Sequence, residues 1–118
     1  MKKLLGQILE IEDVQGISLM SFAGEVIFQE DSSVFPREVE ESGIWKRLFQ
    51  AMKEIREADL VFENMRLYIR STDLGYLVVV MGLFAPAAMV RMNCDMLLPF
   101  LREKGKPKGL RSFFRKKS

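Results

Sequence analysis

The chain has 118 residues, of which 48% are hydrophobic and 29% are charged, and this composition is typical of a globular domain that can bury one core. Its longest uninterrupted apolar run, residues 76–81, is far shorter than the roughly 20 residues of a membrane-spanning helix. The single cysteine, Cys94, cannot form an internal disulfide, so the sequence predicts a cytoplasmic protein.

The net charge of +2 conceals two oppositely charged regions. Residues 102–118 contain eight Lys or Arg and one acid, whereas residues 1–101 contain ten Lys or Arg and fifteen acids. Glycines and a proline follow residue 104. The sequence therefore predicts a folded domain over residues 1–104 and a basic, flexible tail over residues 105–118.

The first half of the chain predicts a helix followed by a β-hairpin. Residues 3–12 carry an apolar stripe at helical spacing, which predicts a short amphipathic helix. The segments GISLMSF and EVIFQE then flank a turn at Ala23 and Gly24. Gly24 can adopt a positive φ without a Cβ clash, as a tight hairpin turn requires.

The second half predicts a helix, three strands and a last helix. The middle helix begins with Ser42 as its N-cap and carries apolar residues over an arc wider than one packing face needs. Strands are predicted at residues 60–63, around residues 65–70 and at residues 76–82. The last helix begins near Pro86 and runs to about Lys104, with Pro99 expected to kink or split it.

The fold predicted from these elements is an α+β sandwich in the order α-β-β-α-β-β-β-α, with a five-stranded antiparallel sheet. Residues 76–82 are apolar on both faces, so they form the central strand. The hairpin packs against this strand and against the first and last helices.

No motif for catalysis or metal binding is visible. The chain has no histidine, the commonest general base and metal ligand at neutral pH, so Cys94 has no Cys–His pair. A phosphate-binding loop, a nucleophile elbow and paired metal-binding cysteines are also lacking. The acids Glu38, Glu40 and Glu41 are typical of a solvated face or of the first turn of a helix, and not of a catalytic or metal cluster. The sequence therefore predicts a protein that is not an enzyme and uses no cofactor, without excluding chemistry by Glu, Asp or Lys.

The wide apolar arc of the middle helix has two interpretations. Trp45, Phe49 and Met52 complete the core of the monomer, or they form a protein–protein interface, where Trp, Phe and Met are enriched. The short strand at residues 60–63 is predicted to be a sheet edge that pairs with a copy of itself. The candidate residues of this homodimer interface are Ile44, Trp45, Leu48, Phe49, Met52, Leu60 and Phe62.

The basic tail supports an alternative function. Its candidate contact residues are Arg111, Phe113, Phe114, Arg115, Lys116 and Lys117. Aromatic residues among basic ones fit an anionic membrane surface or a nucleic acid, an acidic protein surface, or a solvated tail with no contact.

The strings VQGISLMSFAGEVI and DLGYLVVVMG, together with the order of elements, resemble the Roadblock/LC7 family over roughly residues 3–103. Ala23, where many members have a polar turn residue, and Pro99 depart from its pattern. The resemblance implies a profilin-like, non-enzymatic module with no catalytic residue. It also implies dimers that pair the middle helix, residues 44–55 here, and the third strand, residues 60–63. Many bacterial members bind a small Ras-like GTPase as its regulator or scaffold, so such a GTPase is the expected partner.

Overall fold

The computed structural model describes residues 2–30 and 43–104, and these residues form the elements that the sequence predicts, in the predicted order. The elements are α1 (Lys2–Leu9), β1 (Val14–Met20), β2 (Val26–Glu30), α3 (Ile44–Ala51), β3 (Glu57–Val61), β4 (Arg66–Ser71), β5 (Tyr76–Met81) and α4 (Ala87–Lys104). The predicted α+β fold class is therefore confirmed.

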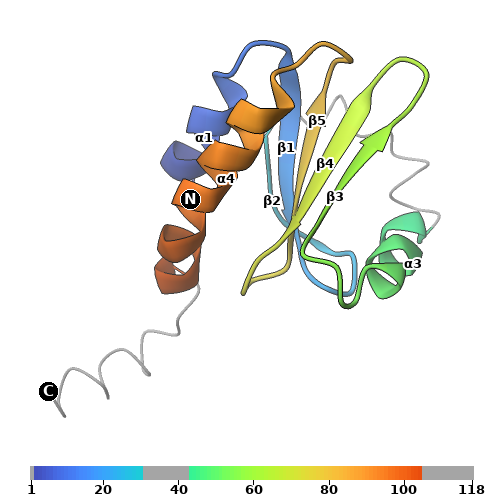
Figure 1. Ribbon diagram of the computed structural model, residues 1–118. Helices are drawn as coiled ribbons and strands as arrows, with labels where there is room; N and C mark the ends of the chain where they lie inside the picture. The colour runs from blue at the N-terminus through green and yellow to red at the C-terminus, as the bar shows by residue number, and fades with distance from the viewer. Residues whose placement is uncertain (1, 31–42, 105–118) are drawn as a thin grey trace, which may run out of the picture.

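The strands form one antiparallel five-stranded sheet in the order β2-β1-β5-β4-β3 (Figure 1). The strand β5 lies at its centre, as its two apolar faces predict, with Ile17 of β1 opposite Val79 and Ile69 of β4 opposite Val78. The hairpin strand β2 forms one edge and β3 forms the other. The predicted placement of the third strand at a sheet edge is confirmed.

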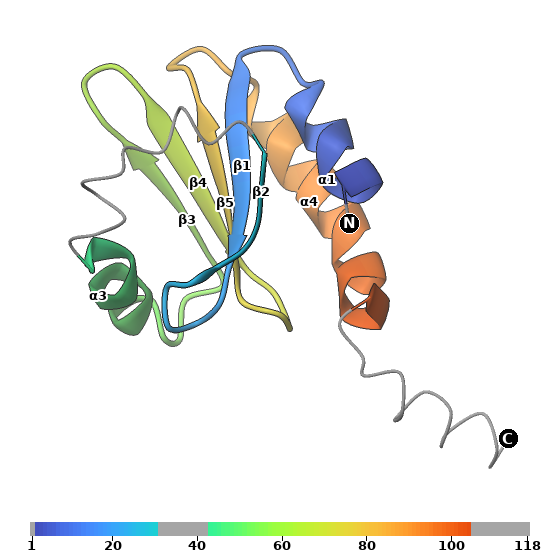
Figure 2. The same ribbon diagram turned by 180° about the vertical axis from the view of Figure 1, so that it is seen from behind.

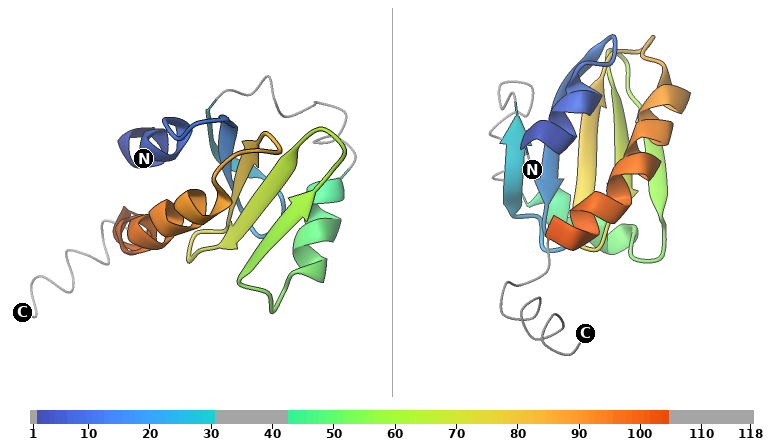
Figure 3. Two further views of the ribbon diagram at one scale, coloured as in Figure 1. Left: turned by 45° about the horizontal axis from the view of Figure 1, so that its top comes forward. Right: turned by 90° about the vertical axis from the view of Figure 1, so that its left-hand side faces the viewer.

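Helices cover both faces of the sheet. The helices α1 and α4 lie side by side on one face, and α3 lies on the opposite face (Figures 1 and 3). Because side chains alternate along a strand, β5 sends Leu77, Val79 and Met81 into a core beneath α1 and α4. Its other residues, Tyr76, Val78 and Val80, enter a second core beneath α3. Both faces of β5 are thus buried, which explains its continuous apolar sequence.

The hairpin turn packs against the beginning of α3 (Figure 2). Gly24 has a φ of 91°, which confirms the predicted positive φ. A Cβ at this position would lie 3.0 Å from the Lys46 nitrogen and 3.4 Å from the Trp45 Cβ. The turn therefore needs glycine for its backbone conformation and for its close approach to α3.

The middle helix and the third strand differ from their predicted bounds. Gly43, not Ser42, occupies the N-cap position of α3, and no side chain caps the helix. The strand β3 covers Glu57–Val61 instead of residues 60–63. Cross-strand pairing explains the shift, since Glu57 lies opposite Arg70 and Val61 lies opposite Arg66 of β4. The strand ends at Val61 because the backbone N–H of Phe62 already donates to the carbonyl of Met65 in the turn.

The last helix is not split at Pro99. The helix α4 runs through this residue from Ala87 to Lys104. Proline lacks the N–H that another residue would donate to the carbonyl of Asp95. Pro99 lies on the exposed side of the helix, so its ring does not enter the core. Leu97 and Leu101 are buried on either side of it and hold the adjacent turns against the core. Packing therefore offsets the lost hydrogen bond.

Candidate functional site

The residues predicted to form the dimer interface differ widely in their burial. The side chains of Trp45, Phe49 and Met52 are 6%, 2% and 3% exposed, because they pack into the core between α3 and the sheet. Leu48 and Leu60 are partly buried against the same core. Ile44 begins α3, and Phe62 lies after β3 with 49% of its surface exposed.

The apolar arc of α3 is thus used inside the chain, which corrects the argument that it is surplus to the core. In the described part of the chain, α3 is the helix that covers this face of the sheet (Figure 1). Among the described residues this short helix supplies the apolar cover of that face, which accounts for its wide apolar arc. Trp45, Phe49 and Met52 belong to the monomer core, and the prediction of an interface now depends on other side chains.

Exposed apolar residues lie near the edge formed by β3. Val61 is 66% exposed at the end of the strand, Phe62 follows it, and Ile55 is 48% exposed just before the strand. Among the described residues, β3 pairs with β4 on one side and continues the sheet no further. An edge strand presents a row of backbone hydrogen-bonding groups that can pair with another chain. This edge is therefore a candidate surface for a protein partner.

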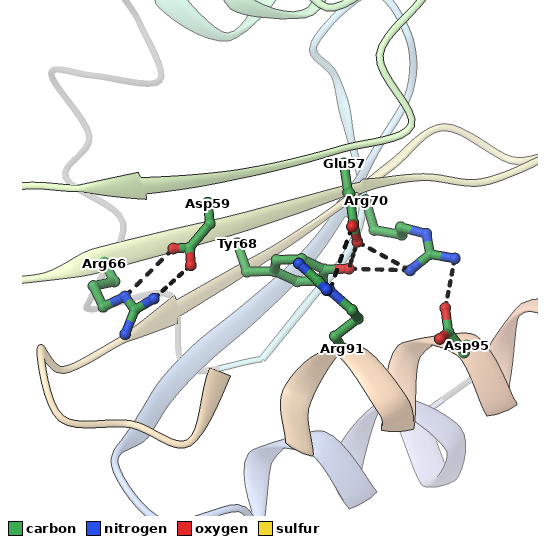
Figure 4. Close-up of polar contacts among 7 residues, drawn as sticks. All are labelled: Glu57, Asp59, Arg66, Tyr68, Arg70, Arg91 and Asp95. Carbon is green, nitrogen blue, oxygen red and sulfur yellow. Dashed lines mark hydrogen bonds and ion pairs between the residues drawn. The ribbon is translucent and has the colours of Figure 1, made fainter. Parts of the chain in front are cut away.

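A polar network fixes this edge to the rest of the molecule (Figure 4). The Tyr68 hydroxyl donates to Glu57 Oε2 at 2.5 Å and accepts from Arg70 Nη1 at 3.0 Å. The second terminal nitrogen of Arg70 contacts Asp95 Oδ1 at 2.5 Å, and Arg91 Nε lies 3.3 Å from Glu57 Oε1. Residues of β3, β4 and α4 are therefore tied together at one point.

A second ion pair continues this arrangement between the edge strand β3 and its neighbour β4. Arg66 of β4 donates to both carboxylate oxygens of Asp59 of β3 (Figure 4). Glu57 and Asp59 thus each lie against arginines. The negative charge of the edge strand is neutralised locally, which lowers the repulsion between this strand and a like-charged partner.

Burial and hydrogen bonding change the pKa of three groups in or beside this network. Burial, reinforced by the hydrogen bond to Glu57, raises the pKa of Tyr68 from 10.0 to about 12. Burial also raises the pKa of the Cys94 thiol from 9.0 to about 12. Burial acts against the charge of Arg70, but its hydrogen bonds to Tyr68 and Asp95 outweigh this, so its pKa is raised. At neutral pH the thiol is therefore protonated and a poor nucleophile.

These shifts predict a loss of stability at alkaline pH. A raised pKa in the folded state means that the native protein holds protons that the unfolded chain releases. This contribution is fully present below about pH 9 and is lost as the pH rises through 12. We expect the free energy of unfolding, measured with urea between pH 8.5 and 11, to fall by on the order of a few kcal/mol.

Lysines also titrate in this pH range, so a control is needed. A double variant, with Tyr68→Phe and Cys94→Ala, removes the contribution of these two groups to the pH dependence of stability and leaves that of the lysines. The double variant should be less stable at pH 8.5 but show a flatter dependence on pH. An equal slope in the variant and the natural chain would contradict the assignment.

The chemistry of the network is structural. Glu57, Asp59 and Asp95 are all engaged with arginines. In residues 2–30 and 43–104, no group of three or more His, Cys, Asp or Glu could hold a metal ion. The carboxylates of this network therefore serve as ion-pair partners that join β3, β4 and α4.

A further exposed apolar surface lies on α4, and the sequence reasoning missed it. Met89, Met92, Met96 and Phe100 are all more than half exposed. Their spacing of three and four residues places them on one side of the helix, beside a buried stripe that includes Val90, Cys94 and Leu97. Two interleaved apolar stripes on a single helix were the signal that could have revealed it.

The candidate tail residues, Arg111, Phe113, Phe114, Arg115, Lys116 and Lys117, lie outside the described residues. The prediction that the tail makes a contact therefore stays a prediction. Of the helices formed by the described residues, none is long and apolar enough to cross a bilayer.

Comparison with solved structures identifies the fold. The chain is similar to a Roadblock/LC7 domain from Streptomyces avermitilis, with 16% identity over 88% of this chain and 96% of that one, and a TM-score of 0.68. It is also similar to MglC from Myxococcus xanthus, with 19% identity, coverage of 87% and 97%, and a TM-score of 0.63. The gliding protein MglB from Thermus thermophilus shows 16% identity, coverage of 80% and 79%, and a TM-score of 0.61.

These structural likenesses show that the chain has the Roadblock/LC7 fold, as its glycine-bearing strings and order of elements imply. No protein-family model and no curated protein matches the sequence. The likeness therefore lies in the three-dimensional arrangement.

Proposed function

We propose that this chain, which has the Roadblock/LC7 fold, is a non-enzymatic homodimeric module that regulates or scaffolds a small Ras-like GTPase. The observation that carries the proposal is the outer edge of β3, which no other strand of the described residues covers, with Val61 and Phe62 exposed beside it. The likeness to MglB and MglC supports it, and one MglB structure of this fold has a tetrameric arrangement. These likenesses do not favour the alternative of membrane or nucleic-acid binding through the tail.

In the proposed dimer, β3 pairs antiparallel with β3 of a second copy across a two-fold axis, and the two sheets become continuous. Glu57 and Asp59 would otherwise set like charges against each other at this junction. Their ion pairs with Arg70, Arg91 and Arg66 reduce that cost. Val61 and Phe62 supply apolar surface next to the paired strands, and the polar network keeps the edge in place before association.

Phe62→Glu should convert the dimer into a monomer, because it places a charge in the apolar part of the junction while leaving the core intact. Light scattering after size-exclusion chromatography at tens of micromolar measures this directly. The intact chain should have twice its monomer mass of 13.6 kDa, and the variant should have the monomer mass. An intact chain that is monomeric, or a Phe62→Glu variant that remains dimeric, would contradict the β3 interface.

The matched control is Met96→Glu, which introduces the same charge on α4 at a residue that is 64% exposed. It should leave the dimer unchanged. If Met96→Glu gives monomers and Phe62→Glu does not, the interface lies on α4 instead.

The GTPase part of the proposal is tested with a purified small Ras-like GTPase, ideally one encoded by a neighbouring gene. The GTPase, loaded with GDP or with a non-hydrolysable GTP analogue, should be retained by the immobilised chain in one nucleotide state more than in the other. A change in its GTP hydrolysis rate would identify a regulator, and binding without such a change would identify a scaffold. The absence of binding in both nucleotide states would reject that GTPase as the partner.

A further inference from the structure

The outward side of α4 carries an apolar stripe that no element formed by the described residues covers. Met89, Met92, Met96 and Phe100, called here the outer stripe of α4, are each more than half exposed, and the exposed Pro99 lies among them. The helices α1 and α4 form the outermost layer on their face of the sheet (Figure 3). Large exposed apolar patches are uncommon on monomeric proteins, and they mark a surface that another segment or molecule contacts.

The outer stripe is uncharged, and the charges around it are balanced. Arg91, Asp95 and Arg102 of α4 each contact a side chain of opposite charge on β3, β4 or the turn after β4. The formal charges of the other two charged residues of α4, Glu103 and Lys104, cancel. The neighbouring segment that contains α1 carries two lysines and two glutamates up to residue 12. Charge therefore does not exclude a basic occupant, and apolar contact must select it.

The chain that follows α4 starts close to the outer stripe. Residues 105–118 lie outside the described residues, so only their sequence is considered. Gly105 follows the last residue of α4, where helices commonly end with a glycine, and Pro107 cannot continue a helix. Residues 105–109 thus offer a short connection, and connections of about two to eight residues join antiparallel neighbours in helical proteins. The sequence therefore favours a reversal of direction along α4.

The segment after this connection has an apolar pattern that matches the outer stripe. Leu110, Phe113 and Phe114 have the i, i+3, i+4 spacing of one helical side, and most of the residues between and after them are basic. A helix of eight residues from Leu110 is about 12 Å long, as is the stripe between Phe100 and Met92. Helices this short are unstable alone in water and need an apolar surface to pack against. The outer stripe is such a surface.

The short connection favours this segment over an occupant from another molecule. A short flexible linker gives the attached segment an effective concentration in the millimolar range, which exceeds the concentration of most separate partners. The side chains on both sides also suit each other. Methionine adapts its shape to its neighbour, so the stripe needs no preformed cavity, and each phenylalanine brings about 150–250 Å² of surface to bury.

We propose that residues 110–118 pack antiparallel on the outer stripe of α4, with Phe113 and Phe114 against Met92 and Met96. The basic residues of the segment then face solvent. Another molecule that binds the stripe must displace the segment, which is thus a removable cover for this face. The inference does not depend on the proposed GTPase partner or on the proposed dimer, because the stripe lies on a helix and the dimer uses the β3 edge of the sheet.

Methyl NMR of the full-length chain, with carbon-13 in the methionine methyl groups, tests this contact. A phenylalanine ring shifts the resonance of a methyl group that packs against it. The Met92 and Met96 resonances should therefore move in a variant that combines Phe113→Ser and Phe114→Ser. Met52 is buried in the core beneath α3, so its resonance should stay in place and show that the variant is folded. Unchanged Met92 and Met96 resonances would overturn the proposal.

Backbone nitrogen-15 relaxation measures the same contact from the side of the segment. The amides of residues 113 and 114 should have order parameters above about 0.6, below which a backbone is flexible. Met96→Glu places a charge in the stripe, at a residue that is 64% exposed, and should lower both values below about 0.6. Phe84→Glu is the matched control, since Phe84 is 93% exposed but precedes α4, and it should change neither value. Low values in the natural chain, or equal effects of both variants, would refute the contact.

The chain that supplies the segment is identified with Phe62→Glu, the variant expected to be monomeric. A contact within one chain gives the same Met92 and Met96 resonances in this variant and at every protein concentration. If the effect of removing the two phenylalanines disappears in the monomer or on dilution, the segment comes from a second copy and the proposal is wrong. A Phe62→Glu variant that remains dimeric would contradict the β3 interface alone, and the NMR result on dilution would still decide the contact.

Discussion

Phe49→Ala is expected to lower the free energy of unfolding by about 3–5 kcal/mol, the usual cost of removing a buried phenylalanine ring. Phe49 is 2% exposed and stacks on both Trp45 and Tyr76, so its loss leaves a cavity that the neighbouring rings cannot close without moving. Urea unfolding followed by tryptophan fluorescence measures the change. Because a folded domain of this size has only about 5–15 kcal/mol of stability, the variant should unfold at a much lower urea concentration.

This result separates a core role for Phe49 from an interface role. Loss of a core side chain destabilises the protein at every protein concentration. Loss of an interface side chain would instead shift the equilibrium between monomer and dimer, and its effect would appear mainly at high protein concentration. The exposed neighbour Gln50 gives the control, and Gln50→Ala should change stability by no more than about 0.5 kcal/mol. A Phe49→Ala variant that is as stable as the Gln50→Ala variant would contradict the packing of α3 against the sheet.

Gly75→Ala should also destabilise the protein severely, by roughly 2–5 kcal/mol, because strain and overpacking act together. Gly75 has a φ of 151° in the turn before β5, and a Cβ there would lie 2.0 Å from the carbonyl oxygen of Met20 and 3.0 Å from the Cα of Ser21. Both obstacles are backbone atoms at the end of β1, so no side-chain rotation relieves the clash. The strands β1 and β5 must separate locally. Thermal and urea unfolding measure the loss.

Gly6→Ala provides the matched control for this substitution. Gly6 lies inside α1, and a Cβ there would meet nothing within 4 Å. Alanine favours a helix over glycine by about 0.5–1 kcal/mol, so this variant should be slightly more stable than the natural chain. A Gly75→Ala variant with unchanged stability would mean that the turn does not approach β1 as closely as described.

The sequence predicted the architecture because the strongest patterns are local. The apolar run of β5 requires burial on both faces, and Gly24 and Gly75 mark the turns between strands. The helical spacing of α1, α3 and α4 is equally clear. From these features alone follow the order of elements, the central position of β5 and the exposure of β3 at an edge, all confirmed by the sheet order β2-β1-β5-β4-β3.

The sequence could not place the bounds of β3, because the residues that form it are mostly polar or small. The strand begins at Glu57 instead of residue 60 because its carboxylates meet arginines of the neighbouring strand and of α4. Glu57, Arg70 and Asp95 are far apart in the sequence, and each alone is an ordinary surface residue. Only the folded chain brings Glu57 and Asp95 to Arg70 and places Tyr68 between Glu57 and Arg70.

The sequence by itself predicted a helix with a wide apolar arc over residues 44–55, observed over Ile44–Ala51, but not which surface this helix contacts. Trp45, Phe49 and Met52 fit a monomer core and an interface equally well, since both bury large apolar side chains. The tertiary structure decided for the core, because α3 provides the cover for its face of the sheet within the described residues. It also moved the candidate interface to Val61 and Phe62, and it left the outer stripe of α4 exposed. Periodicity reports which residues must be buried, whereas only packing in three dimensions selects their partners.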